Sequence, residues 1–236
     1  MSKRAIILAG GKGTRLRPYT VVLPKPLMPI GEFPILEVII RQLVHFGFEH
    51  ITMAVNHQAE IIQAFFGDGS KWNIKIDYSL EDKPLNTMGP LRLISDLPDD
   101  FLVMNGDILS DIDFGRFHRE HTERGSIFSI ASYVREHVNQ YGVLEVDDAG
   151  LLNGFREKPT SRFLVSMGVY MASKAVLDAI PENTPYGFDQ LMLDLIAAGN
   201  PAFVERFNGY WLDIGRPDDY MQAIEEFEDK RELFLR

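Results

Sequence analysis

A short apolar strand that runs directly into a glycine-rich turn is the strongest constraint on how this chain folds. Residues 5–9 read A-I-I-L-A, and the turn that follows contains Gly10, Gly11 and Gly13. A continuous apolar run bounded by glycine is typical of a parallel strand buried on both faces. Glycines permit positive φ angles and close backbone approach, so successive N–H groups can converge on an anion. The segment therefore predicts a phosphate-binding turn at the end of a buried strand.

Two cationic side chains follow the turn. Arg15 has a planar guanidinium suited to bidentate contact with phosphate oxygens, whereas Lys25 is a point charge. Lys25 stands between Pro24 and Pro26, so we expect no helix there. The alternative interpretation is a tight strand-to-helix turn followed by solvated charges, and the lysine between two prolines weighs against it. The pair therefore favours a polyphosphate ligand.

Two well-known glycine motifs do not fit the turn. The Rossmann fingerprint needs a third glycine where Leu16 stands. The Walker A loop needs a lysine followed by serine or threonine after Gly13, and Thr14 occupies that position. The sequence therefore predicts a phosphate site of another kind.

The charge balance limits the classes of ligand. The 236 residues include 24 Lys plus Arg and 34 Asp plus Glu, which gives a net charge of −10. This argues against binding to nucleic acid or to an anionic membrane, so an anionic substrate must meet local cations. The absence of cysteine excludes disulfides, thiolate catalysis and cysteine-bound zinc. With no signal peptide and no apolar run of roughly 18 residues, we expect a cytoplasmic protein.

Predicted strands and helices alternate along the chain, which is typical of an α/β fold. We expect one Rossmann-like domain over residues 1–236, with a mixed, mostly parallel sheet and helices on both faces. The hexapeptide repeats of a carboxyl-terminal β-helix domain are missing. The expected strands are 5–9, 51–55, 74–78, 101–104, 126–133, 166–171 and 202–207, with a hairpin of 142–146 and 151–157, and the expected helices are 35–46, 60–66, 90–94, 114–123, 173–179, 191–198 and 217–234.

Six ordered motifs resemble the signature of the sugar nucleotidyltransferases, also called nucleoside-diphosphate-sugar pyrophosphorylases. They are the run from residue 6 to residue 26, F-G-D-G-S at 66–70, N-G-D at 105–107, Y-G-V at 141–143, E-K-P at 157–159 and G-Y-W-L-D-I-G at 209–215. The resemblance implies the nucleotide-diphospho-sugar transferase fold. It also implies a reaction in which a sugar 1-phosphate attacks the α-phosphorus of a nucleoside triphosphate. The products are a nucleotide sugar and pyrophosphate, and a divalent metal, usually Mg²⁺, takes part.

The resemblance assigns roles to individual residues. Arg15 would hold the β and γ phosphates, and Lys25 the α-phosphate and the incoming sugar phosphate. Asp107 and Asp213 would hold the metal, although a carboxylate that caps a turn and a buried hydrogen-bond acceptor are their structural alternatives. The nucleotide-binding residues would be Leu8, Ala9, Gly10, Gly11, Gly13, Thr14, Glu81 and Gly89, and the sugar-phosphate residues Gly142, Glu157, Lys158 and Gly168. An exposed Glu–Lys neighbour pair is the alternative for Glu157 and Lys158.

Substrate preference rests on few residues. A glutamate at position 81 could accept hydrogen bonds from the N1–H and amine of guanine, which favours GTP. The Gly89–Pro90 pair resembles mannose-1-phosphate guanylyltransferases, whereas Ser166 stands where relatives often have asparagine before the glycine at 168. A mannose-like hexose or a heptose 1-phosphate is therefore expected, with a UTP- or dTTP-dependent enzyme as the alternative.

Other interpretations stay open. A catalytically silent regulatory subunit of the same fold would not need the full set of charged residues. A glycosyltransferase could use the D-x-D spacing of Asp111 and Asp113, although carboxylates before a helix more often cap it. We expect His118 and His121 to lie on the polar face of a helix. Relatives commonly form dimers or tetramers, so a homo-oligomer is a further expectation.

Overall fold

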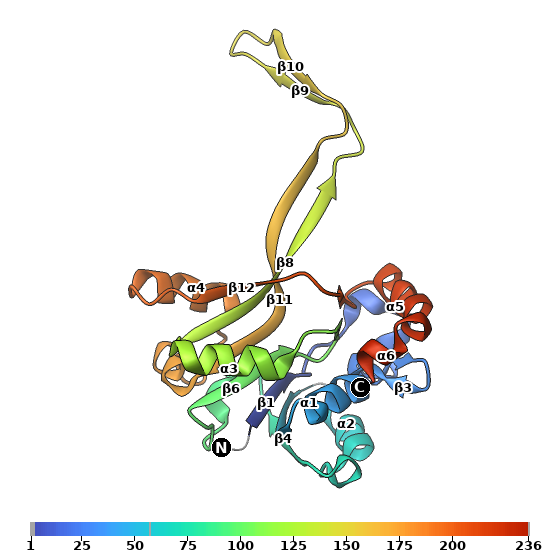
Figure 1. The fold of residues 1–236 in the computed structure, drawn as a ribbon, viewed down its shortest axis with the longest axis vertical. Helices are drawn as coiled ribbons and strands as arrows, with labels where there is room; N and C mark the ends of the chain where they lie inside the picture. The colour runs from blue at the N-terminus through green and yellow to red at the C-terminus, as the bar shows by residue number, and fades with distance from the viewer. Residues whose placement is uncertain (1–2, 57, 236) are drawn as a thin grey trace.

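A seven-stranded sheet forms the centre of the molecule (Figure 1). The computed structural model describes residues 3–56 and 58–235. Strand order is β12-β8-β11-β6-β1-β4-β5, in which β1 is parallel to both β4 and β6 and β11 is antiparallel to β6 and β8. The strands are β1 (Lys3–Leu8), β4 (Phe48–Val55), β5 (Lys75–Leu80), β6 (Asp100–Asn105), β8 (Phe128–Val138), β11 (Thr160–Ser173) and β12 (Phe203–Phe207). The mixed, mostly parallel sheet predicted from the sequence is confirmed.

Side chains of the central strand alternate between two apolar cores. Ala5 and Ile7 of β1 pack into one core, and Ile6 packs into the other. The first core takes its α-helical side chains from α1, α2, α3, α5 and the short helix α6 (Arg231–Phe234), and the second takes side chains from α4 and the 3-10 turns η5 and η6. These are α1 (Ile35–His45), α2 (Ala59–Phe66), α3 (Phe114–Arg124), α4 (Phe188–Ala197), α5 (Pro217–Asp229), η5 (Gly89–Leu93) and η6 (Lys174–Ala179). Helices therefore cover both faces of the sheet, as predicted.

Several short elements differ from the sequence prediction. The segments 90–94 and 173–179 form 3-10 turns where helices are expected, and α6 (Arg231–Phe234) is a separate short helix after α5. Lys25 begins the 3-10 turn η3 (Lys25–Leu27), so the expectation of no helix there is wrong. The reason is that Pro26 lies in the first turn, where no backbone N–H is needed. The other short elements are η1 (Thr14–Leu16), η2 (Tyr19–Val21), η4 (Ser70–Trp72), β2 (Pro29–Ile30), β3 (Phe33–Pro34), β7 (Ile108–Ser110) and β13 (Trp211–Asp213).

A long two-stranded ribbon leaves the sheet and projects away from the rest of the molecule (Figure 1). Its lower part is the paired ends of β8 and β11, and its tip is the predicted hairpin of β9 (Val143–Val146) and β10 (Leu152–Arg156). Both supporting strands are longer than the sequence patterns predict. We call residues 134–164 the arm and the remainder of the described chain the body.

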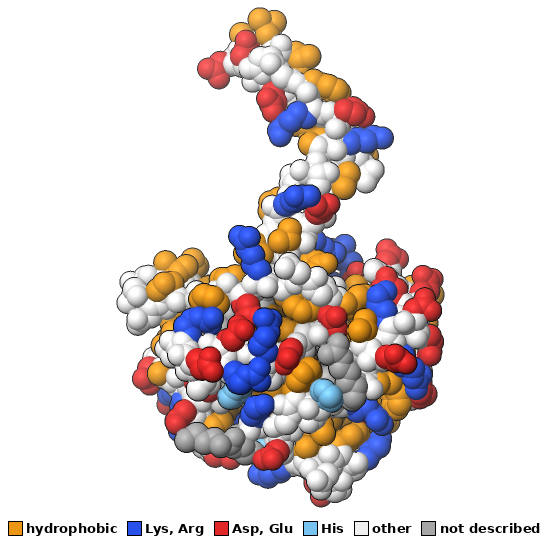
Figure 2. All heavy atoms as spheres, viewed as in Figure 1, with side chains coloured by type: hydrophobic (Ala, Val, Ile, Leu, Met, Phe, Trp, Pro, Cys, Tyr) orange, Lys and Arg blue, Asp and Glu red, His pale blue; other side chains and the backbone are white. Residues whose placement is uncertain are grey.

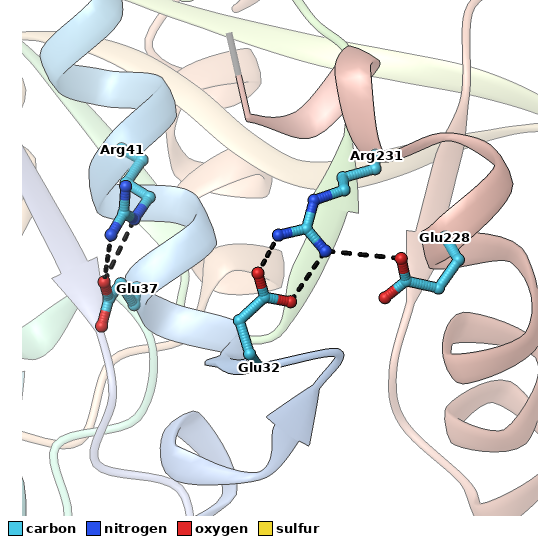
Figure 3. Close-up of polar contacts among 5 residues, drawn as sticks. All are labelled: Glu32, Glu37, Arg41, Glu228 and Arg231. Carbon is cyan, nitrogen blue, oxygen red and sulfur yellow. Dashed lines mark hydrogen bonds and ion pairs between the residues drawn. The ribbon is translucent and has the colours of Figure 1, made fainter.

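Ion pairs tie the last helices to the first third of the chain (Figure 3). Arg231 of α6 contacts both carboxylate oxygens of Glu32 and one oxygen of Glu228, and Arg41 pairs with Glu37 one turn away on α1. These contacts hold α5 and α6 against β2 and β3. Within the ranges that the structure describes, no helix combines the length and the hydrophobicity that a bilayer crossing requires.

Candidate active site

The glycine-rich turn closes one side of a cavity of about 650 Å³ at the carboxyl ends of β1, β4 and β6. A Cβ at Gly10 would lie 3.3 Å from Asn56 and from Oε1 of Glu81, and Gly13 has a φ of 59°. A side chain at Gly10 would require its neighbours to shift, and the positive φ at Gly13 disfavours any residue other than glycine. The cavity is lined by Leu8, Gly10, Gly11, Lys12, Ala54, Asn56, Glu81, Pro84, Asn86, Thr87, Pro90, Asn105, Asp107, Gly187 and Asp189.

Lys25 forms an ion pair with Asp107, which lines the cavity. Lys25 is only 9% exposed, and its Nζ contacts Oδ2 of Asp107. The Thr20 hydroxyl donates to the Gly13 carbonyl at 2.7 Å, which holds the Lys25 segment against the glycine turn. A buried ammonium needs such a partner, because burial alone disfavours the charge. The proline-flanked lysine is thus brought to the end of β6, 82 residues away in sequence.

A small ribbon of β7 and β13 brings the second predicted metal ligand to the same place. Asp213 lies opposite Ile108 in this pair, and the Ile214 N–H donates to the Asp107 carbonyl at 3.1 Å. Burial raises the pKa of the Asp213 carboxyl, and the negative charge of Asp107 raises it further, while Lys25 and Arg15 oppose this shift. The structure therefore places Arg15, Lys25, Asp107 and Asp213 in one electrostatic cluster.

Gly215 lies next to both Arg15 and Asp213. A Cβ at that position would lie 3.5 Å from both terminal nitrogens of Arg15 and 3.5 Å from Oδ2 of Asp213. Arg15 itself is exposed at the start of the chain segment that follows the turn. Its guanidinium is therefore free of the core and close to the carboxylate of Asp213.

The two aspartates suit a divalent cation. Oδ1 of Asp107 is buried without a hydrogen-bond partner, and the Asp213 carboxylate carries an unfavourable charge at the same place. Among the described residues no group of three or more His, Cys, Asp or Glu gathers as a complete metal cage. Mg²⁺ commonly uses one or two carboxylates together with water and substrate phosphates, so an incomplete set of this kind fits it.

A second cavity of about 320 Å³ adjoins the first, and Asn105 lines both. Its other lining residues are Arg135, Val165, Ser166, Met167, Gly168, Tyr170, Trp211 and Asp213. Gly168 lies in a bulge of β11 with a φ of 73°, and a Cβ there would be 2.6 Å from the Asn105 amide nitrogen. The bulge thus presses the backbone against Asn105, where only glycine fits. The aspartates lie where the two cavities meet.

Three predicted sugar-phosphate residues lie elsewhere. Gly142, Glu157 and Lys158 are exposed on the arm, where a Cβ at Gly142 would be 3.2 Å from Oε2 of Glu157. In the described part of the chain, neither Glu157 nor Lys158 makes a hydrogen bond or ion pair with the body. The structure brings these three together with each other, but apart from Lys25 and Asp107.

The predicted nucleotide residues are placed unevenly. Glu81 lines the large cavity, burial raises its pKa, and it accepts a hydrogen bond from the Leu85 N–H at 3.0 Å. Ala9 donates to the Ala54 carbonyl at 2.9 Å, and Thr14 is exposed where η1 begins. Gly89 is buried beside the cavity, and its N–H already donates to the Tyr186 carbonyl at 3.1 Å.

Some residues that line the two cavities were not predicted from the sequence. Asn105 belongs to the N-G-D motif, so its position could have been found, whereas Asn56, Arg135 and Asp189 carry no local signal.

The prediction that His121 lies on the polar face of a helix is wrong. His121 is fully buried, and its Nδ1 lies 2.8 Å from the Ser129 hydroxyl.

The D-x-D pair has structural roles. Asp113 accepts from the Arg116 N–H at 2.7 Å and caps α3, as predicted for a carboxylate before a helix. Asp111 accepts from the Tyr210 N–H at 2.7 Å and anchors the loop that leads to β13. Neither carboxylate lines either cavity.

Comparison with known proteins identifies the family of the chain. The nucleotidyl transferase family profile matches residues 4–230. The chain is 36% identical to a UTP–glucose-1-phosphate uridylyltransferase of Synechocystis over 94% of its own length and 62% of the relative's. It is 35% identical to a probable mannose-1-phosphate guanylyltransferase 1 of rice, Oryza sativa, over 96% of its length and 65% of the relative's. The chain thus spans less than two thirds of these curated relatives.

Solved structures share the fold. HddC from Yersinia pseudotuberculosis superposes with a TM-score of 0.73 at 28% identity, over 95% of this chain and 99% of that one. A Bacillus anthracis protein provisionally named glucose-1-phosphate thymidylyltransferase, in complex with a sucrose, gives a TM-score of 0.77 at 21% identity, over 97% and 96%. At that identity the second likeness concerns the fold alone. The chain is therefore a member of the sugar nucleotidyltransferase family.

Proposed function

We propose that this chain transfers a nucleoside monophosphate from a nucleoside triphosphate to a sugar 1-phosphate and releases pyrophosphate. The observation that carries the proposal is the cluster of Arg15, Lys25, Asp107 and Asp213 at the junction of two cavities. The larger cavity lies beside a glycine turn, as a nucleotide requires, and the smaller one has room for a sugar. Two cations and two acids at the junction suit the meeting of two phosphates.

The reaction needs positioning and charge neutralisation more than acid–base chemistry. A phosphate oxygen of the sugar 1-phosphate forms a bond to the α-phosphorus, and the bond from that phosphorus to the oxygen bridging to the β-phosphate breaks. Pyrophosphate leaves with the electron pair. Because the attacking group is already an anion at neutral pH, no general base is required. Lys25 lies where it can neutralise both the α-phosphate and the attacking oxygen, and Arg15 can hold the departing phosphates.

Asp107 and Asp213 would hold a Mg²⁺ ion at the junction. A bound divalent cation neutralises charge on the phosphates and orients them for in-line attack. Ion binding would also relieve the two features noted above, the unpartnered Oδ1 of Asp107 and the unfavourable charge of Asp213. Lys25 already contacts Oδ2 of Asp107, so Oδ1 is the oxygen that would hold the ion.

Glu81 favours GTP as the nucleotide. Its carboxylate lies next to Gly10 in the lining of the large cavity, and guanine presents an N1–H and an amine from which one carboxylate can accept together. Uracil and thymine present a single N–H between two carbonyls, so the same carboxylate would meet at least one acceptor. HddC from Yersinia pseudotuberculosis has been solved with GMP-PN, and several relatives near 34% identity are named mannose-1-phosphate guanylyltransferases. The 36% identity to a uridylyltransferase keeps UTP as the second candidate.

The sugar 1-phosphate would enter the smaller cavity beside Gly168. Arg135 supplies a cation there that the sequence motifs do not include. Gly142, Glu157 and Lys158 would complete the site, with Glu157 accepting from sugar hydroxyls and Lys158 binding the phosphate. A mannose-like hexose or a heptose is the proposed sugar class.

Pyrophosphate release tests the proposal. The chain is incubated with Mg²⁺, with each of GTP, UTP, dTTP, ATP and CTP, and with a panel of hexose and heptose 1-phosphates. We expect release that requires both substrates and is fastest with GTP. No release with any pair would contradict the proposal and leave a silent binding subunit.

A variant pair tests the base preference. Glu81→Gln should lower the GTP-to-UTP ratio of kcat/KM about tenfold or more, because a charge-assisted hydrogen bond is lost. The matched control is Asp82→Asn, which removes the same charge from the exposed neighbouring position. An unchanged ratio in Glu81→Gln would remove Glu81 from base recognition.

A further inference from the structure

The smaller cavity lies at the base of the arm and differs from it in surface chemistry. Large apolar side chains are exposed along the arm (Figure 2). The cavity lining, in contrast, includes the polar or charged side chains of Asn105, Arg135, Ser166, Tyr170 and Asp213. Arg135 and Asp213 carry charges, which suit a phosphate and a metal ion. The three uncharged side chains are therefore left to meet the uncharged part of a ligand.

Ser166 and Tyr170 of β11 are hydrogen-bonded to each other across the bulge. Ser166 Oγ lies 3.0 Å from the hydroxyl oxygen of Tyr170. The N–H of Gly168, midway between them in the chain, donates to Ser166 Oγ at 3.2 Å. Four residues of regular strand would place the two backbones about 13 Å apart, so the bulge shortens the path between the hydroxyls. The two side chains thus form one polar pair in the cavity lining.

Aromatic packing fixes the position of the Tyr170 hydroxyl. Tyr170 is only 5% exposed. Its ring stacks on Phe188 of α4 with the centroids 4.8 Å apart, and the ring of Phe128 on β8 lies 5.5 Å away. Burial raises the pKa of Tyr170, so the phenol keeps its proton at neutral pH. The hydroxyl is therefore a hydrogen-bond donor that is held in one place.

The pair has one more hydrogen than its own contacts use. Two hydroxyls bring two hydrogens, and the bond between Ser166 and Tyr170 uses one of them. Within residues 3–56 and 58–235, no carbonyl or carboxylate accepts the other. Whichever way the mutual bond runs, one O–H is left over beside the cavity.

The N–H of Gly168 decides which hydroxyl keeps the free hydrogen. A hydroxyl that accepts a hydrogen bond becomes a better donor, because successive bonds polarise one another. Ser166 accepts from Gly168, so its own hydrogen is directed to Tyr170. The free hydrogen is then that of the phenol, which is also the more acidic of the two hydroxyls.

The hydroxyl pair lies next to the junction of the two cavities. Asn105 lines both cavities, and a Cβ at Gly168 would lie 2.6 Å from the amide nitrogen of Asn105. Gly168 in turn donates to Ser166. A sugar that occupies the smaller cavity, with its phosphate at the junction, must therefore lie beside the pair.

We infer that Tyr170, polarised by Ser166, donates to one hydroxyl oxygen of the sugar, so that the site selects a sugar 1-phosphate with oxygen at that carbon over its deoxy analogue. The inference deepens the proposed function and rests on it, because it concerns the sugar 1-phosphate of the same reaction. A site built to bond a substrate hydroxyl rejects the analogue that lacks it, since the buried donor is left unpaired. Tyr170 contacts the substrate, and Ser166 is a positioning residue that acts through Tyr170.

A deoxy series tests the contact. The substrates are mannose 1-phosphate and glucose 1-phosphate, each with its 2-, 3-, 4- and 6-deoxy analogues. The measurement is kcat/KM for pyrophosphate release at a saturating nucleoside triphosphate. For the wild type, we expect loss of oxygen at one carbon to lower kcat/KM about tenfold to hundredfold more than loss at the others.

Tyr170→Phe should remove this discrimination. The variant keeps the ring between Phe128 and Phe188 and lacks only the hydroxyl. It should lower kcat/KM for the parent sugar phosphate by the same factor, and the disfavoured deoxy analogue should then react as fast as its parent. A change in folding alone would lower both values and leave their ratio unchanged, so the ratio separates recognition from structure.

Tyr133→Phe is the matched control. Tyr133 is a partly buried tyrosine of β8 that packs on Trp211 with the centroids 5.4 Å apart, and it lines neither cavity. Its loss of a hydroxyl should leave the whole deoxy series unchanged. Ser166→Ala should lower kcat/KM for the parent about threefold to tenfold. Combined with Tyr170→Phe it should add nothing, because Ser166 acts only through the phenol.

Several results overturn the inference. One is a wild type that treats all deoxy analogues alike. Another is a Tyr170→Phe variant, folded by circular dichroism, that still discriminates against the same analogue. Losses that add in the double variant would contradict the route from Ser166 through Tyr170.

Equilibrium binding separates this inference from the proposed function. Calorimetric titration with the same sugar 1-phosphates measures Kd without turnover. If the wild type releases no pyrophosphate but its Kd values follow the deoxy pattern and depend on Tyr170, the proposed transfer fails and the sugar recognition stands. If pyrophosphate is released equally fast from the parent and from every deoxy analogue, the transfer stands and the recognition by Tyr170 fails. A chain that neither binds nor uses any of these sugar phosphates overturns both.

Discussion

Strands β8 and β11 run through both the body and the arm, but their apolar side chains are mostly buried in the body and exposed on the arm. Within β11, Val169 and Met171 are fully buried in the body, whereas Phe163 and Leu164 are about half-exposed on the arm. The pairing between β8 and β11 is interrupted only by the bulge between Ser166 and Tyr170 and resumes beyond it. The difference lies in the covering layers, because helices pack on both faces of the sheet in the body and the described chain packs nothing on the arm (Figure 1). The arm is therefore the part of the described chain where large apolar side chains have no covering layer.

The same division separates the two substrates. Residues proposed for the nucleotide and the metal lie in the body, where Lys25 and Asp107 fix one another. Three residues proposed for the sugar phosphate are exposed on the arm, and the hydrogen bonds and ion pairs of the described residues link none of them to the body through its side chain. Substitutions in the two regions should thus affect different kinetic constants.

Lys25→Met should have the largest effect, because it breaks the cluster within the body. We expect kcat to fall about 10²- to 10³-fold, the usual loss when one electrostatic donor to a developing charge is removed. The measurement is steady-state pyrophosphate release at saturating substrates, with circular dichroism to show that the variant is folded at the assay temperature.

The control for Lys25 is Lys230→Met. Lys230 forms a surface ion pair with Glu226 on α5 at 3.1 Å, so its loss should leave kcat unchanged. If both variants kept the wild-type kcat, the cluster in the body would not be the reaction centre.

Lys158→Ala tests the arm in the same way. We expect KM for the sugar 1-phosphate to rise about tenfold to hundredfold, with KM for the nucleoside triphosphate nearly unchanged, because a charge-assisted contact to one substrate is lost. Arg162→Ala is the matched control, since Arg162 is a cation on the same ribbon that pairs with Glu136 at 2.8 Å. Equal effects of the two variants would argue for general attraction by the arm rather than a specific contact.

Arg135→Ala tests the border between the two regions. Arg135 is the second residue of the arm, yet it lines the smaller cavity of its own chain. We expect about a tenfold rise in KM for the sugar 1-phosphate, with Arg135→Lys recovering part of it because the charge is kept and the bidentate geometry is lost. An unchanged KM would assign all sugar-phosphate binding on the arm side to Lys158.

The sequence predicted the body well because its signals are local and periodic. The continuous apolar run of β1 reflects burial on both faces of the strand. The helical spacing of apolar residues in α1 reflects packing of the helix against the core. The site cluster was also predictable, since strand ends of a parallel sheet meet at one edge and the motifs stand at those ends. Lys25 reached the cluster as expected, although through a 3-10 turn that the flanking prolines did not suggest.

The arm could not be predicted in the same way. Its strands carry apolar residues at a period that also fits a buried sheet, so the pattern alone does not show whether anything covers them. Arg135 reaches the smaller cavity only because β8 continues past the edge of the body, and no local motif reports strand length. His121 was misplaced for a related reason, since its burial depends on Ser129 of the neighbouring strand rather than on its own helix.

Asp213→Asn should have the smallest effect of the changes proposed, a modest rise in the Tm of the metal-free chain. Burial and the charge of Asp107 raise the pKa of Asp213 in the folded state, so its ionised form opposes folding at neutral pH. Without divalent metal, the variant should therefore melt about 2–4 °C above the wild type at pH 7.5, which corresponds to about 1 kcal/mol in a domain of this size. As the pH falls through the raised pKa, the wild type gains the proton and loses the repulsion, so the difference in Tm should shrink. Thermal scans from pH 7.5 to pH 4 in EDTA measure this gap. If the difference in Tm widened on acidification, the surroundings would stabilise the ionised form of Asp213. That result would contradict the proposal that the carboxylate is destabilised until a cation binds.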